Sequence, residues 1–131
     1  MADRAEIKSA VVDILTASGL FMKILTEPSD IEKERSYPIV WIYLGDEMIL
    51  DGAISTTCYM RNITLEITLG AKHLSSDDNM DELIDSVFDL MKSNFTLNGT
   101  AINLTPTSVR TDQGYLHPYA LAAISFTVTT R

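Results

Sequence analysis

An alternation of apolar and polar residues between Ile63 and Leu69 constrains the fold of this chain more than any other feature of its sequence. Because successive side chains of a strand point to opposite faces, the alternation predicts a strand with one buried face and one polar face. The segment from Tyr119 to Thr130 carries a similar alternation. The chain is therefore expected to build a β-sheet whose apolar face must be covered by other elements.

Two further segments carry apolar residues at helical spacing and can supply that cover. The first apolar stripe consists of Ile7, Ala10, Val11, Ile14 and Leu15, and the second of Met80, Leu83, Ile84, Val87, Phe88 and Met91. The stripes predict helices over about 3–17 and 79–93. Asp3 and Glu6 have the spacing of a capping box, and Gly19 suits a C-terminal turn.

Three more segments are predicted to be strands. Residues 20–26 give a short one, and the run from Tyr37 to Leu44 is apolar throughout. Such a run is expected of a central strand that is covered on both faces or by a neighbouring subunit. After a turn at Asn98-Gly99, residues 102–109 form a strand that passes Pro106. A last turn at residues 112–114 leads into the C-terminal strand.

Two segments lack a regular pattern. Residues 27–36 are charged and contain a proline, which predicts an exposed loop. Residues 45–58 form either an extra hairpin or a mobile arm. The resulting order α-β-β-arm-β-α-β-β predicts an α+β fold, with a mostly antiparallel or mixed β-sheet and two α-helices packed on one face. Threonines line the opposite face, which is most often the solvated side of such a sheet.

The composition indicates one soluble domain that spans residues 1–131. With 46% apolar and 21% charged residues, the chain has the means to bury a packed core. Its single cysteine excludes an intrachain disulfide, and its first residues do not resemble a signal peptide. No apolar run approaches the ~20 residues of a membrane helix. We therefore expect a reduced, cytoplasmic protein without a membrane segment.

The net charge of −8 argues against a protein that grips nucleic acid. The ten Lys and Arg residues are scattered, so no basic stripe could replace phosphate counterions. An acidic surface would repel DNA and so suits the wall of a channel through which DNA moves without binding. Solubility explains such a charge at least as often.

No pattern in the sequence predicts catalysis. Neither a nucleophile elbow nor a phosphate-binding glycine loop occurs, and Cys58 has no histidine nearby in the sequence. His73 and His117 fall at the ends of predicted strands and are expected to be edge or turn residues. The acidic cluster at the second predicted helix consists of Asp77, Asp78, Asp81, Glu82 and Asp85. It lacks the spacing of a calcium loop and suits the helix dipole, so we expect no enzyme, cofactor or metal site.

Two apolar features remain as candidates for binding. The aromatic residues Tyr37, Trp41 and Tyr43 could stack a ligand, but an apolar strand is more often core or subunit interface. Met48–Leu50 stand between charged residues in the irregular segment 45–58, and exposed apolar groups rimmed by polar ones mark protein contact sites. The alternative is an ordinary hairpin that packs on the sheet.

The whole layout resembles that of the tail terminator, or tail completion, proteins of long-tailed bacteriophages. The resemblance covers the amphipathic first helix, the proline-led apolar strand Pro38–Ile42, the irregular arm and the alternating strand Ile63–Leu69. It continues through a second helix like Asp81–Met91 and a closing strand like Ala120–Thr130. It depends on order and pattern, because no single residue is diagnostic.

The resemblance implies a structural virion protein that forms a homo-oligomeric ring, usually a hexamer. Such a ring binds the tail tube protein, ends tail polymerisation and offers its other surface to the head connector. DNA passes through its lumen without specific binding. The protein would be assembled in the host cytoplasm and reside at the head-proximal end of the tail. The expected contact residues are Asp46, Glu47, Met48, Ile49, Leu50 and Asp51 in the arm, and Glu27, Asp30, Glu32, Lys33, Glu34 and Arg35 in the loop.

Two alternatives stay open on sequence grounds. Another phage neck or tail-tube component would share the layout but would polymerise into filaments or join other parts. A small enzyme or ligand-binding domain would use His73 and His117 with nearby acids in a cleft.

Overall fold

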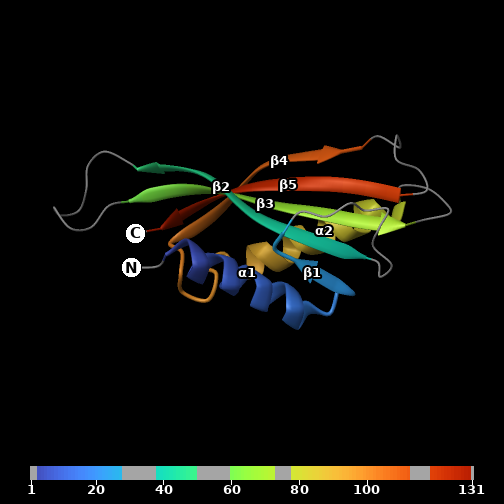
Figure 1. The fold of residues 1–131 in the computed structure, drawn as a ribbon, viewed down its shortest axis with the longest axis horizontal. Coiled ribbons are helices and arrows are strands. Elements are labelled where there is room, and N and C mark those ends of the chain that lie inside the picture. The colour runs from blue at the N-terminus through green and yellow to red at the C-terminus, as the bar shows by residue number, and fades with distance from the viewer. Residues whose placement is uncertain (1–2, 28–37, 50–59, 73–77, 113–118, 131) are drawn as a thin grey trace.

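The computed structural model describes residues 3–27, 38–49, 60–72, 78–112 and 119–130. The described elements are α1 (Arg4–Ser18), β1 (Lys23–Leu25), β2 (Ile39–Ile49), β3 (Arg61–Lys72), α2 (Asp78–Ser93), β4 (Asn103–Thr111) and β5 (Tyr119–Thr130). This set of two helices and five strands confirms the predicted α+β fold and the predicted order of elements (Figure 1).

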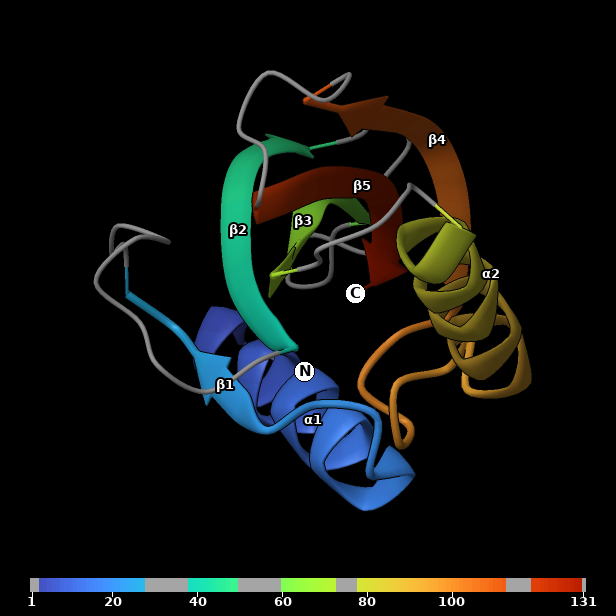
Figure 2. The same cartoon turned by 90° about the vertical axis from the view of Figure 1, so that its right-hand side faces the viewer.

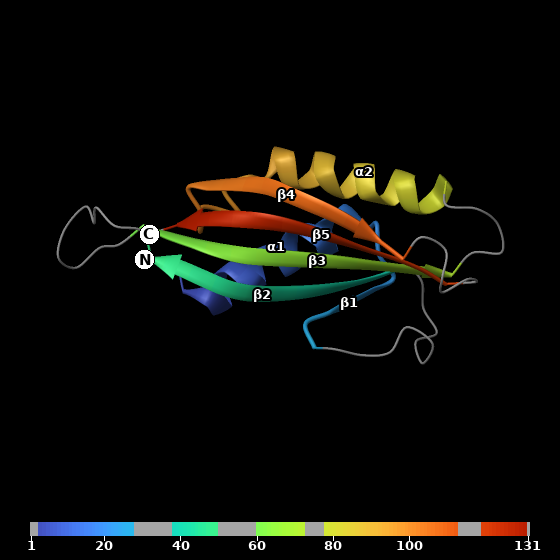
Figure 3. The same cartoon turned by 90° about the horizontal axis from the view of Figure 1, so that it is seen from above.

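The five strands form one mixed sheet in the order β1-β2-β3-β5-β4. β1 pairs with β2 in parallel, whereas the other three neighbouring pairs are antiparallel. Figure 3 shows the four long strands lying side by side. The sheet is curved, and both helices lie on the same side of it (Figure 2), as the sequence predicts.

The core fills the space between the helices and the sheet. Every second residue of β3 from Ile63 to Leu69 is fully buried there, and alternate residues of β5 from Ala122 to Val128 join them. The two predicted helical stripes complete this core. The buried helical side chains are Ile7, Ala10, Val11, Ile14, Leu15, Met80, Ile84, Val87 and Met91. The alternation between Ile63 and Leu69 thus corresponds to the buried and polar faces of the sheet.

The ends of α1 follow from the residue types at its termini. The Asp3 side chain accepts a hydrogen bond of 2.8 Å from the backbone N–H of Glu6, which satisfies one of the free donors of the first turn. At the other end Gly19 adopts φ 70°, a left-handed conformation that glycine enters without a steric penalty. The helix therefore begins and ends within one residue of its predicted bounds.

The structure corrects the prediction for the first part of the irregular segment. Residues Gly45–Ile49 continue β2, and Glu47–Ile49 pair with Arg61–Ile63 of β3, so β2 and β3 are both longer than predicted. The register shifts between Leu44 and Glu47, which is the mark of a β-bulge. This shift interrupts the alternation in the sequence, and the strand was missed for that reason. Residues 50–58 lie outside the described part.

Two other strands differ from their predicted bounds. β1 has three residues instead of the predicted seven-residue segment, because the parallel pairing with β2 covers Ile39–Trp41 only. In β4, the register against β5 shifts between Pro106 and Ser108. β4 is an edge strand, and a proline without an N–H is tolerated at an edge or a bulge.

The apolar start of β2 is buried on both faces, as predicted for a covered central strand. Val40 and Ile42 belong to the main core, whereas Ile39 and Trp41 form a smaller cluster on the opposite face of the sheet. Trp41 is only 3% exposed. Its burial indicates a packing role and not the stacking platform that was considered as an alternative.

Candidate interaction surfaces

The hairpin end, defined here as Gly45–Ile49 of β2 with Arg61–Ile63 of β3, presents apolar side chains to solvent. Met48 is 65% exposed and Ile49 is 61% exposed, although both lie in a regular strand. Met48 is opposite Asn62 and Ile49 is opposite Arg61 in the antiparallel ladder. Because consecutive residues of a strand point to opposite faces, the hairpin end carries one exposed apolar side chain on each side of the sheet.

A polar network fixes the base of this hairpin end to α1. The Arg4 guanidinium donates hydrogen bonds of 2.9 and 2.8 Å to the carbonyl oxygens of Leu44 and Gly45, at the bulge. The Glu47 carboxylate lies 3.2 Å from Arg61 and 3.9 Å from Arg4. The bulge therefore exposes carbonyl groups that a side chain from a distant part of the chain satisfies, and these contacts join the base of the hairpin end to α1.

The expected contact residues differ in their exposure and in their contacts within the subunit. Met48 and Ile49 are exposed as anticipated, and Asp46 is exposed beside them. Glu47 is engaged in ion pairs within its own subunit. Glu27, in the predicted loop, is exposed at the limit of the described residues. The remaining expected contact residues, Leu50, Asp51, Asp30, Glu32, Lys33, Glu34 and Arg35, lie outside the described residues.

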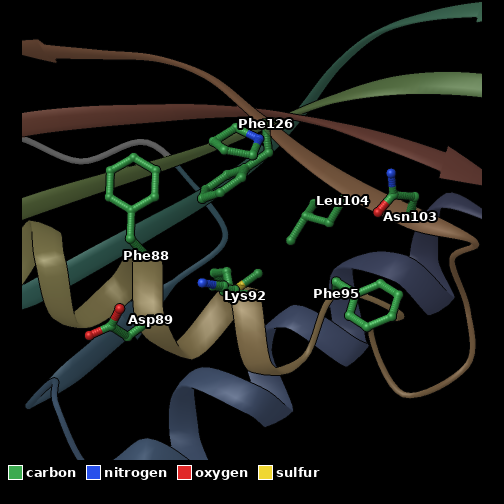
Figure 4. Close-up of a pocket in the computed structure, with 9 residues that line it drawn as sticks. Phe88, Asp89, Lys92, Phe95, Asn103, Leu104 and Phe126 are labelled. Carbon is green, nitrogen blue, oxygen red and sulfur yellow. The ribbon is translucent and has the colours of Figure 1, made fainter.

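A second candidate surface is an apolar groove between α2 and β4, which the sequence did not predict. The groove has a volume of about 600 Å³. Its lining residues are Phe88, Asp89, Met91, Lys92, Phe95, Asn103, Leu104, Pro106 and Phe126 (Figure 4). We refer to this space as the α2–β4 groove. Pockets of roughly 300–1,000 Å³ are common binding sites in proteins.

The groove exists because α2 packs toward the middle of the sheet. Phe88 of α2 meets Phe126 of β5 edge to face, with ring centroids 6.0 Å apart, and Leu104 is the one residue of β4 that is buried. The edge strand is thus left largely without a helix over it. Phe95, which follows α2, is 48% exposed at the mouth of the groove.

Sequence reasoning missed the groove because each lining residue is ordinary in its own segment. Phe88 and Met91 were correctly predicted to lie on the apolar stripe of α2, and Leu104 was correctly predicted to begin a strand. Only the spacing between α2 and β4 leaves an open space between them. The one available signal was Phe95, an aromatic residue just beyond the stripe of the second helix.

The face of the sheet opposite the helices is polar over the ends of β3, β4 and β5, as predicted. Thr64, Thr105 and Thr107 are exposed there, and Thr129 donates a hydrogen bond to the side-chain oxygen of Asn62. Near the aromatic cluster, burial and then the neighbouring charge of Glu66 raise the pKa of Tyr43. This face is therefore polar at one end of the long strands and carries the apolar cluster around Trp41, with Tyr43 packed against it, at the other.

The candidate catalytic and metal residues add little to these surfaces. His73, His117, Cys58, Tyr37 and Asp77 lie outside the described residues. Asp81, Glu82 and Asp85 are exposed along α2. Among the described residues, no three His, Cys, Asp or Glu side chains come together as a metal site. No described helix is long and apolar enough to span a membrane.

No protein-family model and no curated protein sequence matches the chain. The candidate surfaces therefore have to be interpreted from their own geometry.

Proposed function

We propose that this protein is a structural subunit that works by self-association, and that its copies form the ring that terminates the tail tube of a long-tailed bacteriophage. In this role the ring stops tail polymerisation and provides the surface for head–tail joining. The observation that carries the proposal is the pair of unlike apolar surfaces on one subunit. They are the exposed hairpin end and the α2–β4 groove.

The positions of the two surfaces favour a closed ring over a simple dimer. The hairpin end belongs to β2 and the groove adjoins β4, with β3 and β5 between them in the sheet. A contact between two different patches repeats from subunit to subunit and closes into a ring when the rotation permits. A symmetric dimer would need one self-complementary patch instead.

The resemblance of the layout to tail terminator proteins supplies the virion context of the proposal. The acidic charge of −8 suits a lumen through which DNA passes without binding. The proposed partners are copies of the same chain, the tail tube protein and the head connector. The ring would be used in the virion after assembly in the host cytoplasm.

Size-exclusion chromatography with light scattering, over a range of protein concentrations, tests the self-association. We expect a discrete oligomer whose mass is a fixed multiple of the 14.5 kDa chain. Electron microscopy of tail tubes assembled with and without the protein then tests the capping. Tubes of defined length with density at one end support a terminator, and open-ended filaments of the chain itself support a tube subunit. A chain that stays monomeric at every concentration and leaves tubes unchanged contradicts the proposal.

A further inference from the structure

The α2–β4 groove has two apolar walls that face each other. Phe88, Met91 and Phe95 come from α2 and the turn after it, whereas Leu104, Pro106 and Phe126 come from the sheet. Figure 4 shows Phe88, Phe126, Leu104 and Phe95 around one open space, with Asp89 pointing away from it. An occupant that fits this groove must therefore be apolar on two opposite sides.

The hairpin end has that property. Met48 and Ile49 are adjacent strand residues, so their side chains leave the strand in opposite directions, and each is more than half exposed. A strand that covers a core on one side buries its apolar side chains there and turns polar ones to solvent. Exposed apolar groups on both faces of this part of β2 fit insertion between two layers, and the network of Arg4, Glu47 and Arg61 joins it to α1.

The charges beside the two surfaces are also complementary. Asp46 is exposed two residues before Met48, while Lys92 lines the groove. The acid that also lines the groove, Asp89, points away from the open space (Figure 4), so a cation at the groove and an exposed acid beside the hairpin end favour attraction between them.

We propose that the hairpin end of one subunit inserts into the α2–β4 groove of a second copy, with Met48 and Ile49 between the two walls. This contact rests on the proposed function, because it specifies how the copies of the ring join. Each subunit then gives one hairpin end and receives one, so the contact is head to tail. The groove is the receiving site, and no other protein is needed to fill it.

Single-surface variants test each half of the contact. The double substitution Met48→Asp with Ile49→Asp removes the apolar hairpin end, and Phe95→Asp puts a charge at the mouth of the groove. Each variant should raise the dissociation constant for self-association by about tenfold or more, since apolar residues at the centre of an interface dominate binding. Phe95→Ala is a milder groove variant in case the charge disturbs folding. Met22→Asp is the matched control, because Met22 is 72% exposed and belongs to neither surface.

Mixing the two deficient variants gives the decisive measurement. In a head-to-tail contact, the intact hairpin end of the groove variant still fits the intact groove of the hairpin variant. Light scattering should therefore find both variants monomeric when alone and a one-to-one dimer, but no ring, when they are mixed. Circular dichroism must show that every variant retains the wild-type fold.

The outcomes separate this inference from the proposed function. If the wild type forms its oligomer and the Asp variants form it equally well, the contact is wrong while self-association stands. If both variants are monomeric but the mixture contains no dimer, the two surfaces do not meet each other and the inference is also overturned. If the wild type is monomeric at every concentration, the proposed function fails and this contact fails with it.

Discussion

Arg4 joins the first turn of α1 to the base of the hairpin end. Its side chain reaches across 40 residues of sequence to two carbonyl oxygens at the bulge, and it also faces the Glu47 carboxylate. At the residue scale, this side chain joins α1 to the base of the hairpin end through Gly45 and Glu47, three and one residues before Met48.

Replacing Arg4 with alanine should lower the free energy of unfolding by about 1 kcal/mol, because two charge-assisted hydrogen bonds are lost at a partly exposed site. Urea denaturation measures the change. Arg4→Lys is the matched control, since lysine keeps the charge near Glu47 but lacks the planar fork that bonds two carbonyl groups. We expect its stability to fall between those of the wild type and Arg4→Ala. A variant Arg4→Ala as stable as the wild type would show that the network is dispensable.

Tyr43 should make the stability of the protein depend on pH in the alkaline range. Burial, and then the charge of Glu66, raise its pKa above the ordinary tyrosine value of about 10. The folded state then holds the phenolic proton more tightly than the unfolded chain does. The stability from this effect is complete below the ordinary pKa and is lost as the pH rises through the raised pKa.

Tyr43→Phe should therefore lose less unfolding free energy than the wild type when the pH rises from about 9 to about 11. Urea denaturation at several pH values measures this difference. In Glu66→Gln the repulsion is gone but the burial remains, so ultraviolet titration should find the pKa of Tyr43 lower than in the wild type. Identical alkaline slopes for Tyr43→Phe and the wild type would contradict the assignment.

At the scale of elements, the agreement between sequence and structure follows the regularity of each segment. α1, α2, β3 and β5 have regular periodicity, and most of their buried residues belong to the predicted stripes and alternations, whereas Leu83 and Phe88 of the α2 stripe are only partly buried. β2 was predicted only as far as Leu44, because the shift in register before Glu47 interrupts the two-residue alternation of apolar and polar side chains. A bulge is stabilised by contacts such as those of Arg4, which a local pattern does not contain.

The central strand β3 offers the sharpest test of the predicted faces. Ile67 is fully buried between two neighbouring strands, so Ile67→Ala should lower the free energy of unfolding by about 2–5 kcal/mol through lost burial and a new cavity. The adjacent Thr68 points to the other face, and Thr68→Ala should cost less than about 1 kcal/mol. Thermal or urea unfolding of both variants measures the loss of unfolding free energy at each position. Equal losses at the two positions would mean that the faces are assigned wrongly.

At the scale of the whole molecule, the proposed ring contact predicts that self-association depends on one pair of opposite charges, which can be reversed by substitution. Asp46 beside the hairpin end and Lys92 in the groove would face each other between subunits. Asp46→Lys and Lys92→Asp should each weaken self-association, because each places like charges together. The double variant should recover most of the loss, since the pair is restored with reversed signs.

Light scattering over a concentration series measures these three variants. Lys8→Asp changes the charge by the same amount as Lys92→Asp, but on α1 and away from the groove, so it is the matched control. If the double variant associates no better than the worse single variant, Asp46 and Lys92 do not meet.

The sequence alone determined the two helices, the long strands as far as the bulge of β2, and the buried sides of β3 and β5, because these depend on periodicity within one short segment. It also indicated that Met48 and Ile49 are unusual. The tertiary structure decided the rest: the extension of β2 through a bulge that Arg4 supports, and the groove that α2 leaves beside β4. Both features depend on residues that are distant in sequence. The distances between these residues are set only by the packing of the helices on the curved sheet.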